Sequence, residues 1–379
     1  MNASFDVVIV GGGVTGAAVG YGLAKRGVKT CLVDAVPTFS RASRANMGLI
    51  WCQSKALGCP QFVRWGFASS RAYGKLAAEL KELSGIDTGY APTGGIIPCL
   101  GEAELEARAQ FIEKLRAETE DGTYPASVLS RKELEGMLPK VPFGPEVSGG
   151  IWSDMDGYVD PLHLMFAFRK SFVRLGGTLF AGERVSEVKP SGKGYAVVCG
   201  GRTLECGKAV LAAGLGVRKL AAQLGTDIPV FPNKSQVMLL ERIPADVLPI
   251  PLLGIARTFG GTVMIGAAHE NMGMDRRLTP EVLAANAQWA VRVWPELERK
   301  RILRFWTGLR VWPKDAYPIY DRIPGHENAF VFAMHSAVSL AAILEQALPD
   351  YVMGKPLPPD GAIFGLSRFA GGGSGFQGS

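Results

Sequence analysis

The stretch FDVVIVGGGVTGAAVGYGLAKRGVKTCLVDA near the N-terminus limits the choice of folds more than any other part of the chain. A short run of β-branched residues, Phe5–Val10, predicts a buried strand that leads into glycines with the spacing G-x-G-x-x-G. Thr15–Lys25 is rich in small residues and predicts a helix that lies close to a sheet, and Lys29–Val33 predicts a second strand. The three segments form a βαβ unit, the opening element of a doubly wound α/β domain.

Each glycine of this motif has a physical role in binding a dinucleotide. Gly11 permits the tight turn out of the strand, Gly13 lets a pyrophosphate approach the backbone, and Gly16 lets the helix pack against the strand. The N-terminus of the helix offers free N–H groups and a positive dipole end to the phosphates. Asp34 ends the second strand, where a carboxylate accepts hydrogen bonds from an adenosine ribose and repels a 2′-phosphate. We therefore predict a dinucleotide other than NADP, with a purely structural glycine turn as the alternative.

The same spacing recurs at Gly373, Gly375 and Gly378, in the tail GGGSGFQGS. No predicted strand precedes these glycines and no predicted helix follows them. We expect residues 367–379 to be a flexible, glycine-rich tail.

Composition narrows the class of protein. A chain of 379 residues favours two domains. The net charge of +6 fits a nucleic-acid binder, an enzyme for acidic substrates, or an ordinary solvated surface. No block of Lys and Arg stands out, so we adopt the ordinary surface and expect no nucleic-acid partner. The six cysteines include no C-x-x-C pair and no Cys/His cluster, so we expect reduced thiols and no metal site.

Two observations concern cellular location. The longest apolar run, Ala329 to Leu344, is shorter than a membrane-spanning helix requires. The N-terminus predicts a strand and lacks the features of a signal peptide. We expect a cytoplasmic protein without a transmembrane segment, and attachment to the surface of the inner membrane stays open.

The rest of the chain interleaves helical and strand patterns and contains no internal repeat. Helices are predicted at residues 68–83, 102–118, 162–175, 280–294 and 339–353. Strands are predicted at residues 94–100, 178–181, 186–189, 195–199, 203–206, 209–211, 236–241, 262–267 and 329–332. The fold class is α/β: a Rossmann-like nucleotide-binding domain interrupted by an α+β domain with a mixed or antiparallel sheet.

Four segments, in order, carry a resemblance to a known family: the N-terminal βαβ unit, SRASRANMG, VLAAGLG, and WTGLRVWPKDAYPIYDRIPG followed by FAMHSAVSLAAIL. Together they resemble the D-amino-acid oxidase-type FAD oxidoreductases, which include glycine and sarcosine oxidases. The segment RASRANMGLIWCQSKALG is similar to the FAD-carrying B subunits of bacterial opine oxidases, which act on octopine and nopaline. The chain departs from the family pattern at Met334, before His335, and at Ser235, where the family often has glycine.

The resemblance implies how the chain is divided and what it does. We expect residues 1–88, 147–222 and 312–366 to form the FAD-binding domain, and residues 89–146 and 223–311 the substrate domain. A hydride leaves the carbon beside an amine for flavin N5, and water hydrolyses the resulting imine. We expect FAD to be bound non-covalently. Further protein subunits, and a second flavin (FMN) at a subunit interface, are additional expectations.

The resemblance also suggests the cofactor contacts. The residues expected to bind FAD are Gly11, Gly13, Val14, Thr15, Gly16, Asp34, Ser43, Arg44, Asn46, Met47, Gly48, Val185, Ala213, Gly214, Gly308, Arg310, Ser336, Ala337, Val338 and Ser339.

Arg310 is the main candidate for holding the substrate, because a guanidinium group binds a carboxylate through two parallel hydrogen bonds. The alternative is an arginine paired with a nearby acid such as Asp315. His335 is either a contact near the flavin ring or substrate, or a histidine whose hydrogen bonds are satisfied at the start of a helix. Both Arg310 and His335 are predicted catalytic residues.

An opine carries two carboxylates, so a second cation is expected, and Arg257, Lys55 and Lys234 are candidates. Tyr317 is predicted to line the substrate pocket, with a place in the hydrophobic core as the alternative.

Three functions remain open at this point. The first is an FAD-dependent oxidoreductase for opine-like secondary amines that works within a hetero-oligomer. The second is a stand-alone, oxygen-using oxidase of D-amino acids, glycine or sarcosine. The third is a flavin-binding subunit without turnover of its own.

Overall fold

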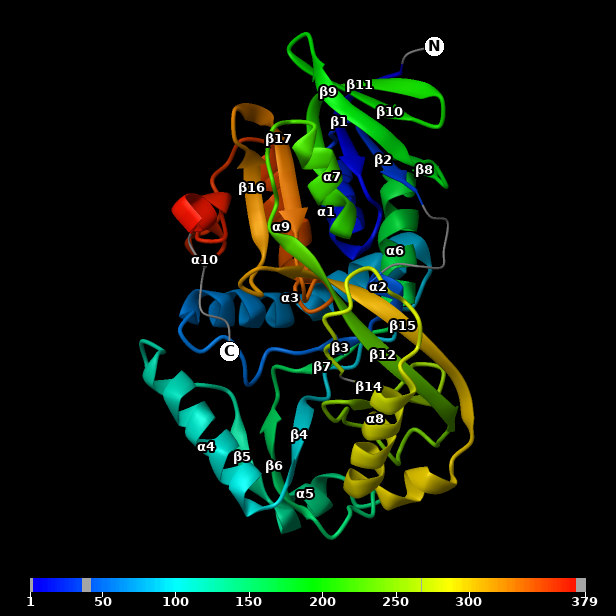
Figure 1. Cartoon of the computed structure of the whole chain (residues 1–379), viewed down its shortest axis with the longest axis vertical. Helices are drawn as coiled ribbons and strands as arrows, with labels where there is room; N and C mark the ends of the chain where they lie inside the picture. The colour runs from blue at the N-terminus through cyan, green and yellow to red at the C-terminus, as the bar shows by residue number, and fades with distance from the viewer. Residues whose placement is uncertain (1–2, 36–41, 267, 373–379) are drawn as a thin grey trace.

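The computed structural model describes residues 3–35, 42–266 and 268–372 (Figure 1). The α-helices are α1 (Val14–Lys25), α2 (Ala42–Ala45), α3 (Pro60–Ser84), α4 (Glu102–Ala117), α5 (Arg131–Met137), α6 (Pro161–Arg174), α7 (Val217–Ala222), α8 (Pro280–Val293), α9 (Ala341–Val352) and α10 (Pro359–Ala362). Short 3₁₀ segments are η1 (Gly214–Gly216), η2 (Pro295–Arg299) and η3 (Leu366–Gly372).

The strands are β1 (Ala3–Val10), β2 (Thr30–Asp34), β3 (Leu49–Ile50), β4 (Gly95–Leu100), β5 (Ser127–Ser130), β6 (Val147–Ser153), β7 (Gly157–Tyr158), β8 (Thr178–Ala181), β9 (Val185–Ser191), β10 (Gly194–Cys199), β11 (Arg202–Leu211), β12 (Val230–Arg242), β13 (Ile255–Arg257), β14 (Thr262–Gly266), β15 (Ile302–Pro313), β16 (Ile319–Ile323) and β17 (His326–Ala333). The mixed α/β fold expected from the sequence is confirmed.

The larger sheet has the strand order β16-β17-β11-β1-β2-β8. β10 also pairs with β11, and β9 pairs with β10. Strands β17, β11, β1, β2 and β8 are parallel, whereas β16 and β10 pair antiparallel with β17 and β11. From Val7 to Val10 both faces of β1 are buried, and the side chains alternate between them. Val7 and Ile9 face the helices α1, α6 and α9, while Val8 and Val10 pack toward β10 and α7.

Residues 202–211 form one strand, although the sequence predicts two. The first half of β11 pairs with β10, up to Cys206, and the second half pairs with β17, from Ala209. Gly207 lies at this change of neighbour, and β1 pairs with the strand on both sides of it. Gly207 thus marks the point where one partner strand replaces another.

The second half of the molecule is built on antiparallel strands. Strands β13, β14, β12 and β15 form one sheet in that order, and β4, β6 and β5 form another. A single parallel bridge between Ile96 and Leu252 joins the two sheets. β12 and β15 are long, and in Figure 1 they run from the lower half of the molecule up to the level of α2. β6 pairs with β4 and β5, so residues 147–153 lie with the strands of the 89–146 segment.

Several helices and strands were not predicted from the sequence or have different bounds in the structure. α3 begins at Pro60, eight residues before the predicted helix, with the proline in the first turn where its missing N–H is harmless. β15 was not predicted as a strand, because glycine, proline and charged residues interrupt its alternation. β5, β6, α5 and β16 were also missed.

The C-terminal part of the chain is more ordered than expected. The predicted flexible tail begins at residue 367, but Leu366–Gly372 form η3 and pack against the body of the protein. Arg368 donates to Asp315 at 2.8 Å and to the carbonyl of Pro318 at 2.7 Å. The glycines at 373, 375 and 378 lie outside the described residues.

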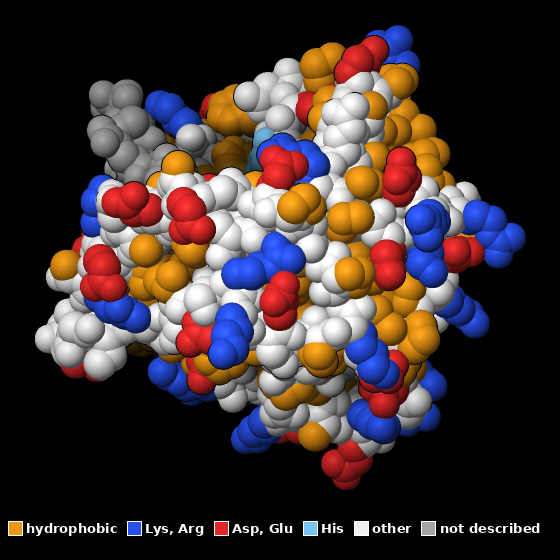
Figure 2. Space-filling view, turned by 90° about the horizontal axis from the view of Figure 1, so that it is seen from below, with side chains coloured by type: hydrophobic (Ala, Val, Ile, Leu, Met, Phe, Trp, Pro, Cys, Tyr) orange, Lys and Arg blue, Asp and Glu red, His pale blue; other side chains and the backbone are white. Residues whose placement is uncertain are grey.

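The surface agrees with the interpretation of the charge. Figure 2 shows a face on which positive and negative side chains are interspersed. All six cysteines are buried and unpaired with one another. Within the described ranges, no helix has both the length and the apolar character needed to cross a bilayer.

A substitution of Arg368 tests whether η3 stabilises the fold. Only 9% of the Arg368 side chain and 0% of the Asp315 side chain is exposed. Arg368→Met leaves a buried carboxylate without its main cation, so we expect the free energy of unfolding to fall by about 3 kcal/mol. Chemical denaturation measures the change.

The exposed pair between Arg64 and Asp360 is a matched control, because it also ties the C-terminal segment to the body. Arg64→Met should change the free energy of unfolding by no more than about 1 kcal/mol. Equal effects of the two substitutions would show that the buried pair has no special role.

Candidate active site

The glycine loop between β1 and α1 has the geometry that a pyrophosphate site requires. Gly11 has a φ of +107°, and a Cβ there would lie 2.4 Å from the carbonyl oxygen of Ala212. A Cβ on Gly16 would lie 1.8 Å from the Gly11 oxygen. Gly13 is the N-cap of α1 and supplies no side-chain cap, so the helix N-terminus is available to phosphate. A nucleotide pyrophosphate fits this loop.

Asp34 has a structural role that the sequence analysis did not identify. Its Oδ2 accepts a hydrogen bond from the Gly12 amide at 2.7 Å and pairs with Arg169 of α6 at 3.2 Å. The carboxylate is buried. It therefore fixes the glycine loop directly, in addition to the ribose contact that we predict.

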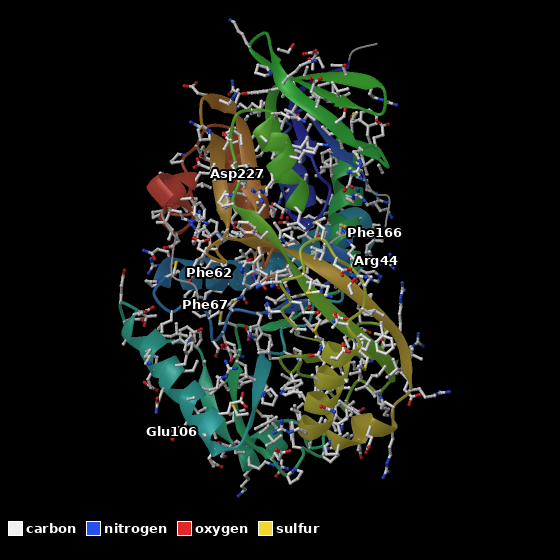
Figure 3. All side chains as sticks on the ribbon, in the orientation of Figure 1. Arg44, Phe62, Phe67, Glu106, Phe166 and Asp227 are labelled. Carbon is white, nitrogen blue, oxygen red and sulfur yellow. The ribbon has the colours of Figure 1, made fainter. Side chains whose placement is uncertain are left out.

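Helix α2 and the residues after it cover the glycine loop. The Ser43 hydroxyl accepts a hydrogen bond from the Val14 amide at 3.1 Å. Asn46 Oδ1 accepts from the Gly48 amide at 2.7 Å, and a Cβ on Gly48 would lie 2.1 Å from the Val159 oxygen. Arg44 lies on α2, and Met47 follows that helix (Figure 3). Ser43 thus joins this segment to the glycine loop.

Other predicted cofactor residues lie at the same edge of the large sheet. Ala213 and Gly214 follow β11, and Gly214 lies against Val311 of β15. Val185 begins β9, shortly after Gly182, whose amide donates to the Asp34 carbonyl at 2.8 Å. Parallel strands bring their carboxyl ends to one edge, which is where ligands bind in doubly wound sheets.

The segment before α9 closes the site from another side. Ser336 has a φ of +60°, a backbone conformation that residues other than glycine rarely adopt. Ser339 Oγ accepts a hydrogen bond from the Trp51 amide at 3.0 Å, and the Val338 carbonyl accepts one from Tyr73 at 2.8 Å. Ala337, between Ser336 and Val338 in the chain, is partly buried. The contacts hold the 336–339 segment against the residues that follow α2.

Strand β15 presents one face to α2. Successive side chains of a strand alternate, so Trp306, Gly308 and Arg310 share a face. The Trp306 indole donates to the Ala45 carbonyl at 3.3 Å, and a Cβ on Gly308 would lie 2.4 Å from that of Ala45. The absence of a side chain at Gly308 lets β15 approach α2. Arg310 is thereby directed to the cofactor side of the sheet.

Arg310 is held entirely by neutral groups. Its Nη1 donates to Asn233 Oδ1 at 2.9 Å and to the Ala268 carbonyl at 2.8 Å, and its Nη2 donates to Ser235 Oγ at 2.9 Å. Asp315, the alternative partner, instead binds Arg368. Among the described residues, no carboxylate lies within ion-pair distance of Arg310. Burial lowers the pKa of Arg310 to about 10, so the group remains cationic at neutral pH.

Ser235 is the residue at which this chain departs from the glycine often found in the family. Its hydroxyl supplies one of the three oxygen acceptors around the guanidinium. The departure therefore adds a polar contact to the predicted carboxylate anchor.

An aromatic group connects Arg310 to His335. The Trp312 ring lies 5.4 Å from the ring of His269 and 4.6 Å from that of His335. His269 Nδ1 is 3.3 Å from the Arg310 guanidinium, and His335 Nδ1 is 2.9 Å from Ser336 Oγ. Burial is the main cause that lowers the pKa of His335 well below its usual value, and the charges of Lys55, Arg310 and His269 act in the same direction. His335 is therefore neutral at physiological pH.

Lys55 lies close enough to His335 for its charge to lower the pKa of that histidine. It lines a small cavity with Trp51, Ser336 and Ser339, and its ammonium group is 5.8 Å from the centre of the Phe62 ring. Figure 3 marks Phe62, on α3, at the level where the two halves of the molecule meet. Burial lowers the pKa of Lys55. Lys55 forms no ion pair within 4 Å among the described residues.

Three other candidates do not direct a side chain to the Arg310 site. Arg257 pairs with Val263 of β14, which in turn pairs with Leu240 near the C-terminal end of β12. Arg310 pairs with Asn233 near the other end of β12, about 20 Å away along the strands. Arg257 donates instead to the Ile243 carbonyl. Tyr317 is buried between Phe62 and Phe364 in the core. Lys234 is already paired with Glu270 at 3.2 Å. The structure therefore brings Lys55, but not these three, toward His335 and Arg310.

A buried carboxylate near Lys55 had no signal in the sequence. Asp156 follows β6, and its Oδ1 accepts hydrogen bonds from the amides of Cys52 at 2.6 Å and Gln53 at 3.3 Å. Its Oδ2 has no partner in the described part of the chain. Burial raises the pKa of Asp156 to about 7, against hydrogen bonds that act to lower it.

The raised pKa of Asp156 predicts how stability changes with pH. The folded state keeps a proton that the unfolded chain loses above its usual pKa of 3.8. Stability from this group is therefore present at low pH and is lost as pH rises toward about 7. Asp156→Asn retains the acceptor oxygen and removes the titration, so the stability of the variant relative to the native protein should increase with pH across this range.

Denaturation curves at a series of pH values measure the difference, with the exposed Asp154→Asn as the matched control. A difference between Asp156→Asn and the native protein that stays constant with pH contradicts the assignment.

Comparisons with known proteins agree with this geometry. The family model DAO, described as FAD dependent oxidoreductase, matches residues 6–344. The B subunit of opine oxidase from Agrobacterium tumefaciens (strain Ach5) is 33% identical over 365 residues, covering 96% of this chain and 97% of that protein. The HcnC subunit of hydrogen cyanide synthase from Pseudomonas aeruginosa is 28% identical and covers 97% of each chain. The crystal structure of glycine oxidase from Geobacillus kaustophilus has a TM-score of 0.89 at 27% identity, covering 98% of this chain and 100% of that chain.

The family match spans most of the chain, and the glycine loop is shaped for a pyrophosphate. The expected cofactor, FAD, and the expected enzyme class are therefore confirmed. This chain belongs to the DAO family of FAD-dependent oxidoreductases.

Proposed function

We propose that the chain oxidises the C–N bond of a carboxylated amine, an amino acid or an N-substituted amino acid of the opine type. The bound FAD supplies the two-electron acceptor for this chemistry. The protein contributes substrate binding, orientation and electrostatics.

The observation that carries the proposal is the charge on Arg310. A partly buried guanidinium whose described partners are all neutral is an incomplete electrostatic arrangement, because burial without a counter-charge is unfavourable. A substrate carboxylate completes it through two parallel hydrogen bonds. Since Arg310 and Gly308 share the face of β15 that contacts α2, the carboxylate is held on the cofactor side of the sheet.

His335 suits a site that binds a neutral amine. Its low pKa keeps the ring uncharged, so it adds no further positive charge. The neutral imidazole, with Trp312, contributes shape and a hydrogen-bonding group rather than a strong base. We propose it as a contact to the flavin or the substrate.

Lys55 favours a substrate with two acidic groups. It is a second cation without an ion-pair partner among the described residues, and its charge acts on the same histidine as that of Arg310. A secondary amine with a carboxylate on each side has one acidic group for each cation. The 33% identity to the B subunit of opine oxidase favours the same substrate class.

Two relatives, the B subunit of opine oxidase and HcnC, are named as parts of larger enzymes, which supports a hetero-oligomeric enzyme. The similarity to glycine oxidase favours the second candidate, a stand-alone oxidase that uses oxygen. The two differ in the electron acceptor and in whether the lone chain completes turnover.

Replacing Arg310 tests the carboxylate anchor. Arg310→Ala should raise the KM of the carboxylated amine by about tenfold to a hundredfold, because a hydrogen bond to a charged group contributes about 1.5–3 kcal/mol. Steady-state kinetics measure the effect, and the flavin absorbance of the purified variant should show an unchanged FAD content.

The matched control is Arg304→Ala, an exposed arginine on the same face of β15. It should leave KM unchanged. Native kinetics in Arg310→Ala would remove this residue from the substrate site.

An anaerobic screen of amines identifies the substrate class and the electron acceptor. Iminodiacetate, N-methylglycine, glycine and D-alanine are each mixed with the protein, and bleaching of the visible flavin band is followed. We expect the dicarboxylic secondary amine to bleach the flavin fastest, because it engages both Arg310 and Lys55.

The same reactions in air, assayed for peroxide, separate the candidates. Bleaching without peroxide from the lone chain supports a subunit that passes electrons to a partner. Rapid peroxide release supports the stand-alone oxidase. A flavin that no amine bleaches would support a binding subunit without turnover.

A further inference from the structure

Lys234 lies directly behind the residues that hold Arg310. It is 1% exposed and occupies β12 between Asn233 and Ser235, which both accept hydrogen bonds from the guanidinium. Because side chains alternate along a strand, Lys234 projects from the opposite face of the sheet. No substrate carboxylate on the Arg310 side reaches its ammonium group.

The ammonium group of Lys234 has three described partners. It donates to Thr279 Oγ1 at 2.7 Å and to the Arg277 carbonyl at 3.1 Å, and it pairs with Glu270 Oε2 at 3.2 Å. All three follow β14 in the chain and precede α8. Lys234 therefore connects β12 to both ends of the 271–278 loop.

Backbone hydrogen bonds join the same residues. The Lys234 amide donates to the Glu270 carbonyl, and the Glu270 amide donates to the Lys234 carbonyl, each at 2.9 Å. The two preceding residues are Ala268 and His269, which contact the Arg310 guanidinium. Segment 268–270 is thus held by Lys234 on one side and holds Arg310 on the other.

Gln236 completes the network on the Lys234 face of β12. Its Nε2 donates to Glu270 Oε1 at 2.7 Å, and its Oε1 accepts from the Thr279 amide at 2.9 Å. Thr279 Oγ1 donates to Glu270 Oε2 at 2.8 Å. Partial burial acts to raise the pKa of Glu270, but these hydrogen bonds and Lys234 outweigh it and lower the pKa. The carboxylate is therefore ionised when it binds Lys234.

The loop between the anchored ends has exposed apolar side chains, with Met272 50% and Met274 62% exposed. Its tip therefore gains little stability from packing, and two further hydrogen bonds reach the loop: Asn233 Nδ2 donates to Asn271 Oδ1 at 3.2 Å, and Thr307 Oγ1 donates to the Arg276 carbonyl at 2.8 Å. Loss of the three ammonium contacts of Lys234 leaves these bonds and the backbone pair, but it weakens the attachment of the segment that carries the Ala268 carbonyl.

We propose that Lys234 is a positioning residue: by anchoring Glu270 and Thr279, it holds Ala268 and His269 in place and so orients Arg310 for a substrate carboxylate. The inference rests on the proposed function of Arg310. A guanidinium group that is oriented before binding loses less conformational freedom when it captures a carboxylate, and the affinity is correspondingly higher. Lys234 acts on binding, so the rate of the chemical step should change little.

The test uses the FAD-loaded protein and acetate as a carboxylate probe. Lys234→Met keeps the length and apolar volume of the side chain and removes its ammonium group. We expect the acetate Kd, measured by isothermal titration calorimetry, to rise about tenfold. With the best amine of the anaerobic screen, KM should rise by a similar factor, while kcat changes by less than about threefold. Lys193→Met, at an exposed turn, controls for the loss of one positive charge.

A second variant separates positioning from general stability. Lys234→Met leaves Glu270 without its cation, whereas Lys234→Met/Glu270→Gln removes both charges. We expect the double variant to regain most of the lost thermal midpoint and to keep the weak acetate affinity. Recovery of affinity together with stability, or native acetate affinity in Lys234→Met, overturns the inference.

Arg310→Ala in the same titration distinguishes this result from a failure of the proposed function. If acetate affinity depends on neither Arg310 nor Lys234, the carboxylate anchor itself is wrong. If it depends on Arg310 alone, the anchor stands and the positioning role of Lys234 is wrong.

Discussion

The active site depends on one partly buried positive charge whose partners, among the described residues, are all neutral. Arg310 has three oxygen acceptors and no described carboxylate partner. In a partly desolvated place such a charge is unfavourable until an anion joins it. The strands, the loop behind them and the small residue at Gly308 together hold this cation against the cofactor segment. The proposed substrate class and orientation both rest on this arrangement.

The two halves of the molecule meet because β12 and β15 extend from the antiparallel sheet toward the edge of the parallel sheet (Figure 1). The parallel sheet supplies the glycine loop and Asp34, while the antiparallel sheet supplies Arg310. Neither half contains a complete site. In the function that we propose, the substrate carboxylate and the nucleotide are held by different sheets, and the reaction takes place where those sheets meet.

Local patterns in the sequence predicted the nucleotide half well. Phe5–Val10, the glycine spacing and the following helix are encoded within a few residues of one another, and the structure has them as β1, the loop and α1. Contacts between distant residues left no such pattern. Nothing near Asp34 indicates that Arg169 pairs with it, and nothing near Asp156 indicates that it binds the Cys52 amide.

The resemblance to a family predicted Arg310 as a site residue, but the hydrogen-bond partners of Arg310 depend on the register between β12 and β15. Asn233 and Ser235 become partners of Arg310 only when β12 and β15 pair in the observed alignment. The same register turns Lys234 away from the substrate, which the sequence could not reveal. The side of the strand on which each side chain lies therefore decides which lysine remains a candidate for a second carboxylate.

The central claim is that the site is built to bind a carboxylate beside the amine. The most direct measurement compares the rate of anaerobic flavin reduction by N-methylglycine with that by N-methylglycinamide, in which a neutral amide replaces the carboxylate. We predict that, at limiting and equal concentrations of the neutral amine, the acid reduces the flavin at least about tenfold faster than the amide, because a hydrogen bond to a charged group is worth about 1.5–3 kcal/mol. Equal rates for the two compounds, with the native protein fully loaded with FAD, would contradict the claim.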